Sequence, residues 1–263
     1  MSKPDHQAWL DNALQGVLAG EPVENISAVQ PDIATDEAYA LQRQLIDMLV
    51  SHGGWGRICG YKAALTAEPA QQAMGVHEPV IGVLFDNGAH TANGQTALAI
   101  TPDRPVLLET ELGFTLGQNI NSPVTPDSVT DLMSTCQAMI ELASPNLQQR
   151  PAGVDLVSTN SASYGFIQSA FTADPKTLEV DQLEVSLSRV APEQETLHSF
   201  PAGTVMGGQY QALAWLINTV LAQEYPLEAG HVLMTGSIGS MHPGTPGEYL
   251  ADFGVLGQLG FKL

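Results

Sequence analysis

LLETELGF, residues 107–114, is a strand-like run in which Glu109 and Glu111 stand among apolar residues. Because side chains in a strand alternate between its faces, both glutamates point to one side, roughly 6 to 7 Å apart along the strand, and Thr110 points to the other. Two like charges in a poorly solvated site raise one another's pKa unless a cation lies between them. The stretch therefore predicts a strand that carries an acidic site on one face.

A third glutamate, Glu141, lies in AMIELAS, residues 138–144, with apolar residues on both sides of it. Apolar residues on both faces are typical of a buried strand. Three such carboxylates offer only oxygen ligands, which favours Mg2+ or Mn2+ over zinc or copper. Glu-x-Glu also occurs on half-exposed edge strands, so the pattern alone leaves a solvated pair and an unrelated Glu141 open as the alternative.

The charge balance limits the classes of partner. The chain of 263 residues has 9 Lys+Arg against 28 Asp+Glu and a formal net charge of −19. Such a chain repels nucleic acid and anionic membranes, and we expect neither as a partner. An anionic small substrate would need a local cation, which a metal ion and one well-placed lysine would supply.

The two cysteines, Cys59 and Cys136, form no CxxC pattern and no cluster with histidine. Neither a disulfide framework nor a zinc site is indicated. The sequence MSKPDHQAWL has no basic region followed by an apolar run, and no later stretch reaches the length of a membrane span. We therefore expect a cytoplasmic protein.

Residues 6–53 are predicted to form two amphipathic helices joined by a turn near Pro31. The second helix has the clearer bounds, with Thr35 as the predicted N-cap, acids in the first turn, and Gly53 at its end.

From Arg57 onward, short apolar runs are broken by Gly, Pro, Asn and Asp. Helices are expected only from Thr125, as N-cap, to about Ser134, and from Gln209 to Glu224. The predicted strands are 57–65, 80–85, 105–117, 136–144, 163–171, 183–190, 231–236 and 255–263. Because strands greatly outnumber helices, we predict an α+β fold with a mixed, rolled sheet rather than a doubly wound one.

Five segments, GYKAALT (60–66), MGVHEPVIGVLFD (74–86), LLETELGF, IELAS (140–144) and GHVLMTGSIG (230–239), follow one another in an order and spacing that resembles the fumarylacetoacetate hydrolase superfamily. Within it, the chain is most similar to the 2-keto-4-pentenoate hydratase and 4-oxalocrotonate decarboxylase branch. The resemblance covers nearly the whole chain. It implies a fumarylacetoacetate hydrolase-like mixed β-sandwich roll over residues 57–263, with a small helical N-terminal subdomain over residues 1–56.

The resemblance also implies a divalent metal held by Glu109, Glu111 and Glu141, in agreement with the independent interpretation of the three carboxylates. Lys62 falls on the lysine of the family's G-x-K-x-x-L-T motif, and Leu65 of the same motif is expected to contact substrate. We predict that Lys62 is the main acid/base or electrostatic residue, and that its burial lowers its pKa toward neutrality. An ordinary surface lysine is the alternative.

Two segments depart from the family pattern. Glu78 fits the family's G-V-x-E-P and is a catalytic candidate in a loop that could close over the metal, but His77 stands where many hydratases have an aspartate. In STNSASYGF (158–166), Asn160 and Ser161 replace the usual Asp and Asn, and a neutral amide cannot accept a proton as a base. We keep His77 as a substrate-binding candidate.

Hydroxyl groups supply the remaining candidates. Ser163, retained from the family segment, is a catalytic candidate, and Thr235 and Ser237 in GHVLMTGSIG are predicted to bind the substrate carboxylate through hydroxyl and backbone N–H donors. A simple turn at the end of a strand is the alternative for the last two.

The implied chemistry is a Mg2+- or Mn2+-dependent addition of water to a 2-hydroxypenta-2,4-dienoate-type acid, giving a 4-hydroxy-2-oxo acid. Decarboxylation of a 2-oxo-diacid is the main alternative, and hydrolytic cleavage of an acylpyruvate fits the helical N-terminus and GYKAALT less well. A non-catalytic metal-binding partner subunit is a further alternative. The family association also suggests a homo-oligomer, with possible pairing to a homologous decarboxylase or hydratase.

Overall fold

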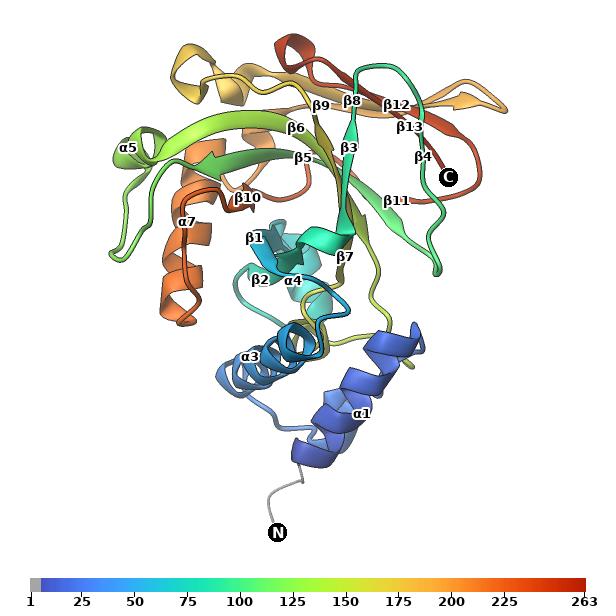
Figure 1. The fold of residues 1–263 in the computed structure, drawn as a ribbon, viewed down its shortest axis with the longest axis vertical. Coiled ribbons are helices and arrows are strands. Elements are labelled where there is room, and N and C mark those ends of the chain that lie inside the picture. Colours follow the sequence, from blue (N-terminus) through green and yellow to red (C-terminus); the bar gives the residue numbers. More distant parts are fainter. Residues whose placement is uncertain (1–5) are drawn as a thin grey trace.

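Two β-sheets and a group of N-terminal helices make up the protein, whose computed structural model describes residues 6–263 (Figure 1). The helices are α1 (His6–Ala19), α2 (Ile26–Val29), α3 (Thr35–His52), α4 (Glu68–Met74), α5 (Pro126–Val129), α6 (Gly153–Ser158) and α7 (Gln209–Ala222). The strands are β1 (Ile58–Ala64), β2 (Val80–Phe85), β3 (Ala89–Ala92), β4 (Leu98–Ala99), β5 (Leu107–Leu116), β6 (Met133–Ala143), β7 (Ser163–Ser169), β8 (Glu184–Ala191), β9 (Glu195–Pro201), β10 (Val232–Met234), β11 (His242–Pro243), β12 (Glu248–Asp252) and β13 (Gln258–Lys262).

The larger sheet has the order β2-β1-β10-β5-β6-β7-β3, with β11 also paired to β5. It is mixed, since β1 pairs with β10 in parallel and β10 pairs with β5 antiparallel. The smaller sheet has the order β4-β13-β12-β8-β9. The expected α+β fold with a mixed sheet is therefore confirmed, and all eight predicted strands are present.

β5 and β6 lie at the centre of the larger sheet and are its longest strands. They pair antiparallel over nearly their whole length, from Leu107↔Ala143 to Leu116↔Met133. Both strands are buried over most of their residues, which agrees with the near-continuous apolar sequence around Glu111 and Glu141. This pairing sets the position of the acidic site.

The N-terminal helices share one hydrophobic core with the sheets. Trp9 and Leu10 of α1 and Leu45 and Leu49 of α3 are buried in the same cluster as the inner residues of β1, β5 and β6. Figure 1 shows α1 and α3 at one end of the molecule and the smaller sheet at the other. The boundary near residue 56 stays a prediction, and residues 1–5 of the expected subdomain lie outside the described chain.

Three helix bounds differ from the prediction, and the simplest case is α7, which ends at Ala222 rather than at the expected Glu224. Thr35 is the first residue of α3 rather than its N-cap; Ala34 occupies the cap position, and its N–H donates to the Glu37 carboxylate at 3.4 Å. The helix expected to run to Ser134 ends at Val129 and is followed by a 3-10 turn, because Met133 already pairs with Leu116 of β5. Long-range strand pairing outweighs local helix propensity there. No helix of the described residues is long and apolar enough to cross a membrane.

Candidate metal centre and substrate pocket

Three glutamates meet on one face of the central strand pair. Glu109 and Glu141 are register partners across β5 and β6, and Glu111 lies two residues further along the same face of β5. One carboxylate oxygen of each lies within 4.8 Å of those of the other two. Thr110 points to the opposite face, as predicted, where its hydroxyl donates to the Ile238 carbonyl at 2.8 Å.

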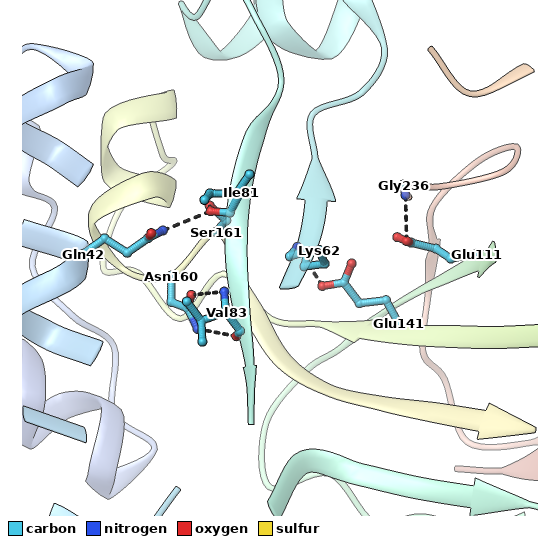
Figure 2. A network of polar contacts seen from close by, with 9 residues as sticks. All are labelled: Gln42, Lys62, Ile81, Val83, Glu111, Glu141, Asn160, Ser161 and Gly236. Carbon is cyan, nitrogen blue, oxygen red and sulfur yellow. Dashed lines mark hydrogen bonds and ion pairs between the residues drawn. The ribbon is translucent and has the colours of Figure 1, made fainter. Parts of the chain in front are cut away.

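Lys62 of β1 reaches the same cluster. Its ammonium forms an ion pair with Glu141, with Nζ 2.7 Å from Oε1, and both side chains are only 2% exposed (Figure 2). Gly82 of β2 stands opposite Lys62 in the sheet, and a Cβ added there would lie 3.0 Å from the Lys62 Cε. Glycine at this position leaves room for the lysine to lie across the sheet. The surface-lysine alternative is therefore excluded by burial.

The loop after β10 closes the other side of the cluster. The Gly236 N–H donates to the Glu111 Oε2 at 2.8 Å (Figure 2). Gly236 has a φ of +111°, and a Cβ there would approach the Thr66 methyl to 2.4 Å. Both the backbone conformation and the close contact require glycine. One oxygen of Glu111 is thus held by the backbone.

Burial and mutual repulsion raise the carboxyl pKa values. The pKa of Glu109 is raised to about 7 by burial first and by Glu141 second, with Lys62 and Ser237 acting in the opposite direction. The pKa of Glu111 is raised well above its ordinary value by burial and by its two acidic neighbours. One lysine does not balance the negative charge of this cluster.

The pKa of Lys62 is raised, which corrects the expectation from sequence. Burial lowers this pKa, but the nearby Glu141, Glu109 and Glu111 carboxylates raise it and outweigh burial. In the metal-free protein Lys62 is therefore a stable ammonium. The prediction was wrong because it considered desolvation without the charges that the fold brings together.

The cluster fits a hard divalent cation. The Glu111 Oε1 is buried and accepts no hydrogen bond, although a buried carboxylate oxygen ordinarily has a partner. The three side chains offer only oxygen ligands, which suits Mg2+, Mn2+ or Ca2+. Glu109, Glu111 and Glu141 would hold the ion, and Lys62 and Gly236 would orient two of these ligands.

A cavity of about 420 Å3 opens beside the cluster. Among the predicted site residues, Lys62, Leu65, Glu109 and Ser237 line it. The Ser237 hydroxyl lies close enough to Glu109 to lower its pKa, but it makes no hydrogen bond of good geometry. These four residues, together with Glu111 and Glu141, form the site that the structure brings together.

The other predicted residues lie outside this lining. The Thr235 hydroxyl donates to Gln209 at 2.6 Å, away from the cavity. Ser163 is buried in β7 and borders a much smaller cavity on the side of the N-terminal helices. His77 and Glu78 are exposed in the loop between α4 and β2. Their proposed contacts with substrate would require this loop to move.

Asn160 and Ser161 hold a strained turn against β2. Asn160, Ser161 and Ala162 have φ values of 68°, 51° and 60°, a left-handed conformation that non-glycine residues rarely adopt in succession. The Asn160 amide accepts from the Val83 N–H at 2.7 Å and donates to the Val83 carbonyl at 2.9 Å (Figure 2). An aspartate could not make the second of these bonds, so asparagine suits this position structurally.

Sequence analysis missed two neighbours of the site. His198 lies behind β5, with Nε2 3.0 Å from the Thr110 hydroxyl and Nδ1 3.0 Å from Nε2 of His242. Burial first, and the neighbouring His242 second, lower the pKa of His198 to about 4. The second neighbour is α4, which lines the cavity with Ala70, Met74 and the N-cap residue Ala67. Their helical spacing and Pro69 at the helix start were signals that could have identified it.

No family model matches the chain. Known relatives match it over most of its length: it is 27% identical over 250 residues to the 2-keto-4-pentenoate hydratase of Paraburkholderia xenovorans (strain LB400), covering 94% of this chain and 90% of that protein. It is also 27% identical over 250 residues to the 2-oxo-hept-4-ene-1,7-dioate hydratase of Escherichia coli, covering 91% of this chain and 90% of that protein.

Solved structures share the fold. The 4-oxalocrotonate decarboxylase from Pseudomonas putida G7, complexed with magnesium and adipate, superposes with a TM-score of 0.88 at 19% identity, over 100% of this chain and 98% of that one. The fumarylpyruvate hydrolase from Pseudomonas aeruginosa, in complex with Mn2+ and pyruvate, has a TM-score of 0.59 at 12% identity, over 79% of this chain and 89% of that one. The expected fold is therefore confirmed.

Proposed function

We propose that the chain, which is similar to the 2-keto-4-pentenoate hydratase and 4-oxalocrotonate decarboxylase branch of the fumarylacetoacetate hydrolase superfamily, is a divalent-metal-dependent hydro-lyase. Its substrate would be a 2-hydroxypenta-2,4-dienoate-type acid and its product a 4-hydroxy-2-oxo acid. The observation that carries this proposal is the cluster of half-buried Glu109 with buried Glu111 and Glu141, which has Lys62 beside it and a cavity next to it.

The reaction adds one molecule of water. The substrate's enol proton is lost and carbon 5 gains a proton, which leaves a 2-oxo-3-enoate with an electron-poor double bond. The oxygen of water then bonds to carbon 4, and carbon 3 gains a proton. A divalent ion, when bound, supplies positive charge that stabilises negative charge developing on the oxygen of carbon 2.

The protein's own groups position the acid. The Lys62 ammonium lines the cavity and would donate a hydrogen bond to the substrate carboxylate or hold a proton near the reacting carbons. The Ser237 hydroxyl, which lacks a well-formed partner, would donate to the same end of the substrate. Leu65 lines the wall beside them with a φ of 53°, a strain of the kind that marks binding sites.

The remaining predicted residues keep subsidiary roles in this proposal. Glu78 and His77 would approach the substrate only when their exposed loop closes over the cavity. Ser163 and Thr235 support the strands that carry the site rather than lining the cavity. We propose Mg2+ as the ion in the cell, with Mn2+ as a substitute, since both accept an all-oxygen ligand set.

Decarboxylation of a 2-oxo-diacid is the second candidate, because the fold superposes closely on a 4-oxalocrotonate decarboxylase. A divalent ion held by the same three glutamates would supply the positive charge that stabilises the enolate left when CO2 departs. A partner subunit without catalysis is the third. The buried carboxylate cluster argues against it, because burying like charges is costly without a function that needs them.

We also propose a homo-oligomer, with pairing to a homologous hydratase or decarboxylase as a further possibility. Support comes from Phe171 and Phe200, large apolar side chains that are 55% and 40% exposed. Analytical ultracentrifugation of the purified protein at several concentrations tests this. A monomer at all concentrations would contradict it.

The activity is tested by giving the protein 2-hydroxypenta-2,4-dienoate with Mg2+ or with EDTA, following the dienol absorbance and identifying the product by mass. Metal-dependent gain of one water is expected. Glu111→Gln should lack this activity, and Glu193→Gln, an exposed glutamate outside the site, should retain it. Release of CO2 from a 2-oxo-diacid without any hydration would establish the second candidate instead.

A further inference from the structure

The cavity beside the three clustered glutamates has a polar part and an apolar part. Glu109, Lys62 and Ser237 lie at one end, which is polar. Most of the remaining lining is apolar. Its volume of about 420 Å3 falls within the range of sites for ligands much larger than a five-carbon acid. The shape therefore leaves space beyond the reacting atoms.

One wall of this space is the short helix α4. Ala70 and Met74 are four residues apart, so they share one face of the helix, and that face lines the cavity together with the N-cap residue Ala67. The polar side chains Glu68 and Gln72 bond to each other on the exposed side. The sequence of α4 thus presents an apolar face to the cavity.

Further apolar lining comes from three parts of the chain that are distant in sequence. Its side chains are Leu107, Pro145, Pro151, Leu156 and Met241. Leu156 is buried, while Met241 is 54% exposed. An apolar group that contacts these side chains would be partly removed from water, which favours its binding.

No free cation faces this space among residues 6–263. Lys62 is the one Lys, Arg or His side chain in the lining, and its ammonium is already paired with Glu141 at 2.7 Å. Arg150 precedes Pro151 but is exposed and does not line the cavity. The lining hydroxyls of Thr66 and Ser240 are neutral, and that of Ser161 donates to the Ile81 carbonyl.

We infer that the site selects 2-oxo and 2-hydroxydienoic monocarboxylic acids with an uncharged, apolar tail of several carbons, and discriminates against diacids. The inference rests on the proposed function in taking the carboxylate cluster as the end that holds the 2-oxo acid. A second carboxylate at the tail would lose its hydration without meeting a cation, in a chain of net charge −19. Ala67, Ala70, Met74, Leu107, Leu156 and Met241 are the specificity-determining residues.

The test measures binding without turnover, by calorimetry in the presence of Mg2+. Pyruvate, 2-oxopentanoate, 2-oxohexanoate and 2-oxooctanoate form the tail series, and 2-oxoadipate is the diacid with the same number of carbons as 2-oxohexanoate. The affinity should rise about threefold to fourfold per added methylene until the space is filled. 2-Oxoadipate should bind about a hundredfold or more weakly than 2-oxohexanoate.

Charge variants test the cause of this discrimination. Met74→Lys, and separately Met241→Lys at the more exposed position, should shift the ratio of 2-oxoadipate to 2-oxohexanoate affinity toward the diacid by about tenfold or more. Val255→Lys is the matched control, since Val255 is 68% exposed and lies outside the cavity. Arg150→Gln should leave the wild-type ratio unchanged, because Arg150 does not line the cavity.

The outcomes separate this inference from the proposed function. Equal or tighter binding of 2-oxoadipate, affinity that is independent of tail length, or no binding of any 2-oxo acid would each overturn the inference. A changed diacid ratio in Arg150→Gln would also overturn it, because Arg150 would then serve as the missing cation. If the affinities follow the predicted order but the protein hydrates no 2-hydroxydienoate, the inference about substrate selection stands and the proposed hydratase activity is rejected.

Discussion

Replacing Glu111 by glutamine should have opposite effects on the metal-free and the metal-bound protein. The ligand oxygens of the three glutamates lie within 4.8 Å of one another. At an effective dielectric constant of about 20, two unit charges at that distance repel each other by about 3.5 kcal/mol. Proton uptake relieves part of this repulsion, because the pKa of Glu111 is raised. We therefore expect Glu111→Gln to stabilise the metal-free protein by about 1 to 3 kcal/mol.

The glutamine should preserve the local structure, because its side-chain carbonyl can still accept the Gly236 N–H bond that Glu111 accepts at 2.8 Å. It should not preserve metal affinity. At a Mg2+ concentration of about 100 times the wild-type Kd, binding stabilises the wild type by about 2.7 kcal/mol. A hundredfold weaker Kd would leave about 0.4 kcal/mol in the variant at the same concentration.

The assay is thermal unfolding of both chains in EDTA and in Mg2+, with isothermal titration calorimetry for the Kd. The wild-type Tm should rise by about 5 to 10 °C on adding Mg2+, and that of the variant by about 1 °C from a higher starting value. Glu193→Gln should behave as the wild type. An unchanged Mg2+ affinity in Glu111→Gln, or a metal-free Tm well below that of the wild type, would refute the reasoning.

Lys62→Met should keep the Mg2+ affinity within about tenfold of the wild-type value and lower kcat by about a hundredfold or more, because the ammonium beside the substrate is lost. Calorimetry measures the Mg2+ affinity and steady-state kinetics measures kcat. A wild-type kcat would mean that Lys62 has only a packing role. Asn160→Asp should lower the free energy of unfolding by about 1 to 3 kcal/mol, because the Val83 carbonyl loses its donor; an unchanged urea midpoint would contradict this. The pKa of His198 is about 4 in the folded protein, below its unfolded value of about 6.5, so its contribution to stability is present above pH 6.5 and is lost as the pH falls toward 4. The stability difference between wild type and His198→Asn should therefore narrow by about 2 kcal/mol between pH 7 and pH 4.5, and urea unfolding that shows no narrowing would mean that His198 is not held neutral.

Eight of the thirteen strands in residues 6–263, and the acidic positions, could be predicted because their signals are local. Alternation along one strand is enough to place Glu109 and Glu111 on one face and Thr110 on the other. The apolar run on both sides of Glu141 indicates a buried strand in the same way. The bounds of helices and strands could be predicted less well where local helix propensity and long-range strand pairing disagree. At Met133, for example, pairing with Leu116 ends the preceding helical turns.

Hydroxyl roles could not be predicted, because a hydroxyl rotates toward whichever partner the fold supplies. Thr235 and Ser237 are two residues apart, yet the Thr235 hydroxyl is bonded to Gln209 on α7 while Ser237 lines the cavity. The prediction for the direction of the Lys62 pKa shift was wrong for a related reason. It depends on the balance between burial and the carboxylates of β5 and β6, which are remote in sequence.

By itself the sequence determined that the chain is an acidic α+β protein with three glutamates in two apolar strands and one lysine in a third. The tertiary structure decided that these four side chains meet, because the register of β5 with β6 sets Glu109 opposite Glu141. It also decided that one face of α4 and the loop at Met241 line an apolar space beside these four side chains. Lys62 is the one basic side chain in the lining of this space. Periodicity along a chain specifies which face a residue takes, whereas the neighbours on that face depend on long-range pairing.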